Sequence, residues 1–214
     1  MWVFKSMRVL TVISHPDPNA FSYAVLDRFA AGVVSAGHTH ETADLYREGF
    51  NPVMSVRDMQ QFENVPMPAD VQDEQRRIEN CDAMCWIFPM WWWGMPAMLK
   101  GWLDRVWSAG WAYKSEHDPE GSLLSSRPLT CLVPTGASIK MINKYGFEEQ
   151  LDNILRAGVF GYCGMDPIRI HFLLDCAFDT GVHSAHLDTA YEAGRCIGLG
   201  ESEYTVQNCA GRAE

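Results

Sequence analysis

The sequence lacks any apolar run near the roughly 20 residues that a membrane-spanning helix requires. Residues 1–7 also lack the long apolar region and the cleavage site of a signal peptide. Positive charge is scarce, because 17 Lys and Arg stand against 27 Asp and Glu and give a formal net charge of −10. That balance argues against nucleic acid or an anionic membrane as a partner. These absences predict a cytoplasmic protein without an integral membrane segment.

The motifs of several enzyme classes are absent as well. No G-x-G-x-x-G follows the first expected strand, no P-loop occurs, and no G-x-S-x-G elbow is present. Rossmann-type dinucleotide binding, P-loop phosphoryl transfer and α/β-hydrolase chemistry are therefore disfavoured. The seven cysteines form no C-x-x-C pair, and a chain of 214 residues does not need disulfides, so we expect reduced thiols. His183 and His186 lack ligand partners at metal-site spacing, so we interpret them as part of a solvated helix face and predict no metal site.

Short apolar runs alternate with amphipathic segments along the chain. Hydrophobic residues make up 47% and charged residues 21%, as in a packed globular domain. The apolar runs predict buried strands at residues 9–13, 39–45, 83–88, 129–133 and 168–174. Helical spacing of apolar residues predicts helices around residues 21–33, 70–80, 96–106, 147–155 and 187–197.

Strands that alternate with helices pair in parallel, because each crossover needs a helix to return the chain. The predicted fold class is α/β: a flavodoxin-like, doubly wound, five-stranded parallel sheet of order 2-1-3-4-5 with helices on both faces. Residues 1–198 are expected to form this single domain, followed by a polar C-terminal tail at 199–214. Residues 50–68 and 113–128 are expected to be long loops.

In such a sheet, ligands bind beyond the carboxyl ends of the strands, where the winding direction reverses. That rule brings together three loops, at residues 14–21, 88–96 and 134–145. In the first loop, we expect Asn19 to cap a helix whose first N–H groups attract a phosphate, although a capped helix without a ligand fits equally well. In the third loop, Gly136 either lets the backbone approach a ligand closely or simply forms a tight turn.

The second loop carries three adjacent tryptophans, Trp91, Trp92 and Trp93. Neighbouring side chains diverge in an irregular loop, so the three indoles cannot all enter the core. Exposing them leaves a large apolar area in water, at a cost of ~25 cal/mol per Å². A planar aromatic ligand and a dimer interface both explain the loop. We expect a mixture, with some indoles facing a cofactor and others facing a partner subunit.

Four blocks of residues now become recognisable together. They are His15 with Asn19-Ala-Phe-Ser-Tyr23, then Asp44-Leu-Tyr46 with Phe50-Asn-Pro52, then Phe88-Pro-Met-Trp-Trp-Trp-Gly-Met-Pro-Ala97 through Leu99-Lys-Gly-Trp-Leu-Asp-Arg105, and Thr135-Gly136. With these blocks, residues 8–197 resemble the NAD(P)H:quinone oxidoreductase family, whose fold is flavodoxin-like. The third block is the most specific, because W-x-G-x-P-A-x-L-K-G-W rarely arises by chance.

The resemblance implies a non-covalently bound flavin, FAD or alternatively FMN, with NAD(P)H as co-substrate. The residues that match the pyrophosphate-binding loop are His15, Asn19, Phe21 and Ser22. The residues that match the strip flanking the isoalloxazine ring are Pro89, Met90, Trp91, Trp92 and Trp93. Thr135, Gly136 and Ala137 match the turn at the pyrimidine end of the flavin. Negative charge collects there after hydride transfer, and N–H donors stabilise it, which gives Gly136 a catalytic role.

The chain also departs from the family pattern. The family's Thr-Thr-Gly-Gly reads Pro134-Thr-Gly-Ala137 here, and the Tyr and His that follow it in the animal enzymes have no clear counterparts. Tyr145 is carried over as the catalytic hydroxyl; the alternatives are that Lys144 fills that role or that the role is vacant.

The function implied is a flavin-dependent NAD(P)H oxidoreductase that reduces quinones or similar electron-poor aromatics by a ping-pong mechanism. We expect a homodimer that takes a small-molecule acceptor. Two alternatives stay open: a regulatory ancillary flavoprotein subunit of a glutathione-gated potassium efflux system, and an electron carrier like flavodoxin.

Overall fold

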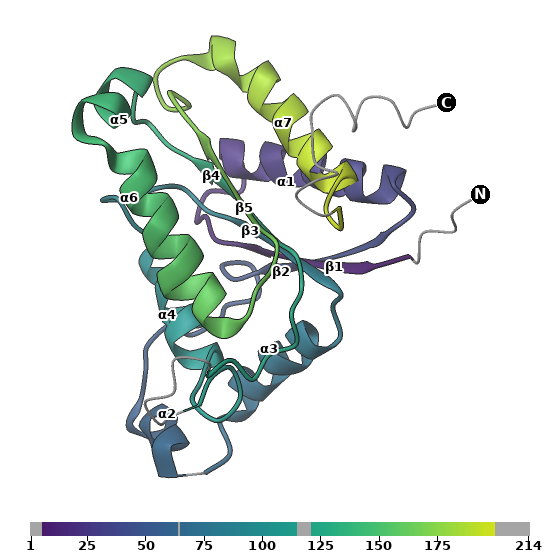
Figure 1. Ribbon diagram of the computed structural model, residues 1–214, viewed down its shortest axis with the longest axis vertical. Coiled ribbons are helices and arrows are strands. Elements are labelled where there is room, and N and C mark those ends of the chain that lie inside the picture. Colours follow the sequence, from purple (N-terminus) through teal and green to yellow (C-terminus); the bar gives the residue numbers. More distant parts are fainter. Residues whose placement is uncertain (1–5, 64, 115–120, 200–214) are drawn as a thin grey trace.

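The computed structural model describes residues 6–63, 65–114 and 121–199. Its five strands form one parallel sheet in the order β2-β1-β3-β4-β5 (Figure 1). The strands are β1 (Arg8–Ile13), β2 (Thr39–Asp44), β3 (Ala83–Ile87), β4 (Leu129–Pro134) and β5 (Ile168–Leu173). The predicted fold class, strand order and strand positions are confirmed, because each strand end lies within one residue of its expected place.

Helices cover both faces of the sheet, as predicted. One face is covered by α1 (Phe21–Ser35) and α7 (His183–Arg195). The other face is covered by α3 (Ala69–Glu79), α4 (Ala97–Val106) and α6 (Phe147–Asn153), which continues as the π-helical η2 (Ile154–Phe160). The shorter elements are α2 (Val56–Met59), η1 (Gln60–Glu63), α5 (Ile139–Tyr145), η3 (Gly161–Cys163) and η4 (Thr180–Val182).

Alternation along β3 explains how one strand serves both faces. Ala83, Cys85 and Ile87 pack against α1 and α7, whereas Met84 and Trp86 point to the opposite layer. All five side chains are buried, so the strand reads as a continuous apolar run. Trp86 is the centre of an aromatic cluster, with the rings of Trp102, Trp107 and Phe160 at 5.4, 5.4 and 5.0 Å in edge-to-face contacts.

Two local expectations are wrong. Helix α1 begins at Phe21, so Ala20 and not Asn19 occupies its N-cap position, and no side chain caps the helix. The Asn19 backbone N–H donates to the Asp17 carboxylate at 2.9 Å. Residues 50–68 are not simply a loop, because they contain α2 and η1. A capping box begins α2, in which the Ser55 hydroxyl accepts from the Asp58 N–H and the Asp58 carboxylate accepts from the Ser55 N–H. The polar tail 200–214 and residues 115–120 lie outside the described residues.

No helix among residues 6–63, 65–114 and 121–199 is long and apolar enough to cross a membrane.

Free thiols occur at Cys81, Cys85, Cys131, Cys163 and Cys176, and burial raises the pKa of each, to about 11 at Cys176. Cys196, however, is disulfide-bonded, so the expectation of reduced thiols throughout the chain is wrong.

Candidate active site

Three loops meet at the carboxyl edge of the sheet. The chain leaving β1 is tied to β3 by the Ser14 N–H, which donates to the Ile87 carbonyl at 3.1 Å. The Met90 N–H after β3 donates to the Pro134 carbonyl at 2.9 Å, and the Thr135 N–H after β4 donates to the Leu173 carbonyl at 2.9 Å. Successive loops are therefore fixed to their neighbours before they diverge from the edge, as the sheet order predicts.

The first loop ends in a helix start with free donors. The N–H groups of Phe21 and Ser22 hydrogen-bond to no described part of the chain, because the first turn of a helix has no internal acceptor for them. Ser14 Oγ is buried at the end of β1 and likewise has no partner among the described residues. His15 Nδ1 lies 3.1 Å from the Asp17 N–H, which fixes its ring beside this helix start.

A buried hydroxyl holds the first loop in place. Tyr23 donates from its hydroxyl to the carboxylate of Asp44, at 3.0 Å, and lies 3.2 Å from the His15 carbonyl. Burial, followed by the hydrogen bond to Asp44, raises the pKa of Tyr23 to about 12. The Arg47 guanidinium covers the Tyr23 ring at 4.6 Å. No sequence pattern indicates that these residues contact one another, so their role in holding the first loop could not be predicted.

The second loop, residues 88–96, is called the aromatic loop. Its tip is a tight turn in which Trp91 and Gly94 exchange backbone hydrogen bonds of 3.2 and 3.1 Å. The two central residues, Trp92 and Trp93, have φ of 51° and 59°. Glycine or asparagine normally fills both positions of such a turn, because a Cβ is crowded there. Two tryptophans in left-handed conformations mark a strained backbone, which is typical of functional sites.

The three indoles diverge, as expected. Trp91 lies edge-on to His15, with ring centroids 5.8 Å apart, and so joins the first loop to the second. Trp92 is 99% exposed at the tip of the turn. Trp93 is half-buried and packs on Phe147, with ring centroids 4.1 Å apart.

Tyr145 lies beside this loop. Its ring is half exposed and stacks on Phe147 at 5.3 Å, so that Tyr145, Phe147 and Trp93 form a row of aromatic rings. The Lys144 ammonium lies 4.9 Å from the centre of the Tyr145 ring. Phe147, which connects the row, was predicted only as part of a helix face.

The first part of the third loop, Thr135 to Ala137, is hydrogen-bonded to the chain that follows β5. The Cys176 N–H donates to the Thr135 carbonyl at 2.9 Å, and the Asp175 N–H donates to the Ala137 carbonyl at 3.1 Å. The Gly136 N–H has no partner among the described residues. Gly136 does not have a positive φ. A Cβ there would lie 3.1 Å from Ala177 and 3.2 Å from Phe178, so this glycine makes room for the chain after β5.

His183 and His186 do not form a solvated face. His183 stacks on Phe21 at 4.0 Å and donates from Nε2 to the Cys176 carbonyl at 2.9 Å. His186 donates from Nε2 to the Leu174 carbonyl at 2.8 Å. Both rings therefore bind the start of α7 to the chain after β5, and through Cys176 to the third loop. Among the residues that the structure describes, no group of three or more His, Cys, Asp or Glu is placed to hold a metal ion.

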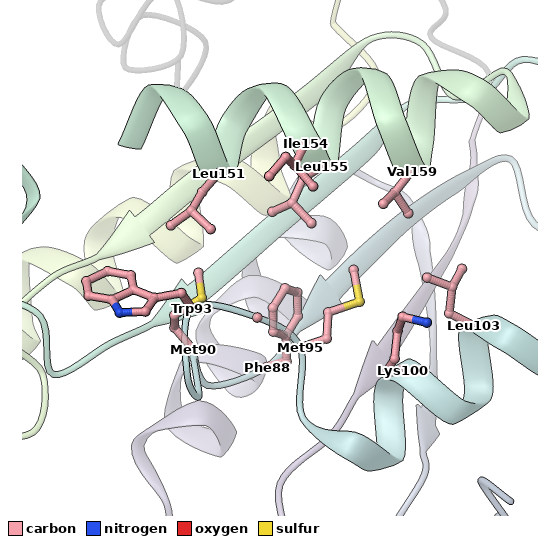
Figure 2. Close-up of a pocket in the computed structure, with 11 residues that line it drawn as sticks. Phe88, Met90, Trp93, Met95, Lys100, Leu103, Leu151, Ile154, Leu155 and Val159 are labelled. Atoms are coloured by element: carbon pink, nitrogen blue, oxygen red, sulfur yellow. The ribbon is translucent and has the colours of Figure 1, made fainter. Parts of the chain in front are cut away.

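A pocket of about 310 Å³ opens between the aromatic loop and the helices α4 and α6 (Figure 2). It is called the α4–α6 pocket. Its lining comprises Phe88, Met90, Trp93, Gly94, Met95, Lys100, Leu103, Leu151, Ile154, Leu155 and Val159. Of these residues, Met90 and Trp93 were predicted to bind the cofactor, and Phe88, Gly94 and Met95 belong to the predicted ligand loop 88–96. Leu151, Ile154 and Leu155 were predicted only as part of a helix.

Comparison with known proteins agrees with this architecture. Residues 7–193 match the family model described as flavodoxin-like fold. An uncharacterized NAD(P)H oxidoreductase of Haemophilus influenzae is 32% identical over 170 residues, which are 79% of this chain and 84% of that protein. NAD(P)H dehydrogenase (quinone) 1 of Cavia porcellus is 27% identical over 182 residues, 76% of this chain and 66% of that protein.

A solved structure gives the same result. The NAD(P)H:quinone oxidoreductase from Methanothermobacter marburgensis superposes with a TM-score of 0.82 at 31% identity, over 92% of this chain and 98% of that chain. The sequence blocks, the sheet order and these relatives agree, and this chain belongs to the NAD(P)H:quinone oxidoreductase family of the flavodoxin-like fold.

Proposed function

We propose that this protein is a flavin-dependent NAD(P)H oxidoreductase that transfers hydride to quinones or similar electron-poor aromatics by a ping-pong mechanism. The observation that carries the proposal is the strained aromatic loop, whose exposed Trp92 and half-buried Trp93 lie between two loops with free N–H donors. A planar, phosphate-bearing cofactor fits that combination, because it needs a flat apolar contact, an anion site and polar donors at its ring edge.

The residues present can hold such a group. The N–H groups of Phe21 and Ser22, at the positive end of the α1 dipole, would bind phosphate. Residues 89–93 of the aromatic loop would flank the ring, and the Gly136 N–H would donate to its polar edge. The buried Ser14 Oγ, which has no partner in the described part of the chain, supplies a further polar atom at the same end of the sheet. A flavin held by these residues would supply the chemistry of hydride transfer between NAD(P)H and the acceptor.

Tyr145 is the proposed proton donor to the acceptor. Its ring is held on Phe147 within the aromatic row, and half of its surface is exposed at the site. A hydroxyl beside a ring that gains negative charge stabilises that charge by hydrogen bonding.

The homodimer expected from the sequence stays a prediction, and the exposed apolar side chains of Val53, Val56, Met59 and Phe62 are compatible with it.

Flavin binding is the first expected result. The purified protein should be yellow, or should bind added FAD or FMN with quenching of tryptophan fluorescence. Trp92→Leu should weaken flavin binding by about 2- to 12-fold, because an aromatic stacking contact contributes ~0.5–1.5 kcal/mol beyond its area. The melting temperature of the apoprotein should not change, since the Trp92 side chain is almost fully exposed.

Phe62→Leu is the matched control, since it shortens another exposed aromatic residue in η1 and should leave the flavin dissociation constant unchanged. A protein that stays colourless and shows no melting shift with FAD or FMN contradicts the proposal. A flavin-containing protein that turns over NAD(P)H and quinone negligibly would instead favour the regulatory-subunit alternative.

Tyr145→Phe should lower kcat for quinone reduction by about 100-fold, the lower range for losing a positioned proton donor. The flavin dissociation constant should change little, because the phenylalanine ring keeps the stack on Phe147. Steady-state kinetics and a flavin titration on the same sample separate these effects. Tyr191→Phe, on α7, serves as the control. An unchanged kcat removes Tyr145 from the mechanism and leaves the role to Lys144 or to the solvent.

A further inference from the structure

We propose that the α4–α6 pocket binds an apolar substituent of the acceptor, a short alkyl or prenyl chain attached to the quinone ring. The inference rests on the proposed function, and it specifies the acceptor further, as a quinone ring that carries an apolar chain. It assigns a binding role to Leu151 of α6 and to Ile154, Leu155 and Val159 of η2, which lie outside the sequence motifs of the family.

The chemistry of the lining decides the kind of ligand. Figure 2 shows side chains from two sides converging on one space, with those of α6 and η2 facing the aromatic loop and α4. Apart from Gly94 and Lys100, every lining side chain is apolar or aromatic. The Lys100 ammonium is ion-paired with Asp104 on its own helix, at 2.5 Å. A polar ligand would lose its hydration here without finding partners, whereas an apolar chain gains from leaving water.

The lining is also adaptable. Met90 and Met95 reach into the pocket with flexible thioether side chains, which adjust to ligands of different shape. Three lining residues, Ile154, Leu155 and Val159, come from the π-helical segment η2. Segments of this rare kind occur frequently at functional sites.

The position of the pocket connects it to the proposed reaction. Met90 and Trp93 belong both to the strip proposed to flank the flavin and to the pocket lining. In Figure 2 the Trp93 indole closes one end, and Leu103 with Val159 lies at the other. An acceptor ring placed against the aromatic loop can therefore direct a substituent past Trp93 between the helices. About 310 Å³ is at the small end for ligand sites, so a short chain fits better than a long polyprenyl tail.

The test compares two benzoquinones with the same ring, one without a chain and one with a chain of three to five carbons. For the wild-type protein, kcat/KM should be at least about tenfold higher with the chain, since each buried methylene contributes up to about fourfold, or ~0.8 kcal/mol. Ile154→Trp and Val159→Trp fill the pocket, and each should reduce this ratio to about one. Ile154 is 59% exposed, so its variant keeps the test open if Val159→Trp does not fold.

Val34→Trp is the matched control, because Val34 is similarly exposed on α1, on the other face of the sheet, and should keep the wild-type ratio. If wild-type protein reduces neither quinone, the proposed function fails. If it reduces both with equal kcat/KM, only the pocket assignment fails. If Ile154→Trp instead turns a dimer into a monomer by light scattering and slows both quinones alike, the pocket is covered by a second copy, and the inference is overturned.

Discussion

Replacing Gly194 with valine is expected to lower the free energy of unfolding by about 3 kcal/mol or more, the upper range for overpacking a tight contact. Helices α1 and α7 lie side by side on one face of the sheet (Figure 1) and approach through a glycine on each. A Cβ at Gly194 would overlap the Phe29 carbonyl oxygen and lie 3.0 Å from the Val33 nitrogen. Because these are backbone atoms, no side-chain rotation relieves the overlap, and the helices must move apart.

The melting temperature should fall by roughly 6–12 °C, at about 2–4 °C per kcal/mol for a chain of this size. Flavin affinity should fall as well, since α7 carries His183, which stacks on Phe21 at the proposed phosphate site. Gly158→Val is the matched control. Gly158 has no heavy atom within 4 Å of an added Cβ, so its stability should change by no more than about 0.5 kcal/mol. Equal melting temperatures for the two variants would contradict the close approach.

The fold could be predicted from the sequence because its signals are local and redundant. The β3 run Ala83–Ile87 is apolar at every position, as a strand buried on both faces requires. Gly37 closes the first helix with φ of 80°, and Pro96 stands immediately before α4. The alternation of strands and helices predicts parallel pairing, and general rules for parallel sheets then place the ligand site at the carboxyl edge of the sheet.

The candidate site was only partly predictable, because its contacts join residues far apart in the chain. Spacing cannot show that His183 stacks on Phe21 or that Tyr23 bonds Asp44. The spacing of His183 and His186 indicates only that they are not a metal site, whereas in the structure both histidines bond backbone carbonyls after β5. Gly136 was interpreted from its turn, but the atoms that its missing Cβ accommodates belong to Ala177 and Phe178.

Asn19 shows how a local rule can fail. Its side chain is a good N-cap by type, but the helix starts one residue later than the rule requires, so that Ala20 occupies the N-cap position. The strained turn at Trp92 and Trp93 likewise could not be predicted from residue preferences. Both residues have positive φ, a conformation that tryptophan rarely adopts and that glycine or asparagine normally supplies. Such conflicts between local preference and structure concentrate at functional sites.

Arg105→Met is expected to cost about 3–5 kcal/mol of stability, as for other buried ion pairs that lose one partner. The Arg105 Nε donates to Asp58 at 2.9 Å, and its Nη1 donates to Asp70 at 2.7 Å and to the Asn51 carbonyl at 2.7 Å. The Asp58 side chain is fully buried, so the variant leaves its charge without the guanidinium. The Arg105 side chain thus holds residues 51–58, which follow β2, against α4, and α4 follows the aromatic loop.

The pH dependence of this loss has a definite sign. Burial alone would raise the pKa of Asp58, but hydrogen bonds from Ser55 and from Arg105 outweigh it and lower the pKa in the folded protein. The wild-type contribution is therefore present above the unfolded pKa of about 3.9, and is lost as pH falls toward the folded value. Urea unfolding should show the full deficit of Arg105→Met at neutral pH and a smaller one below about pH 4.

Arg76→Met, which removes only the exposed pair with Asp73, should cost less than about 1 kcal/mol. A deficit that does not change with pH would mean that packing of the Arg105 stem, rather than the charge of Asp58, accounts for the loss.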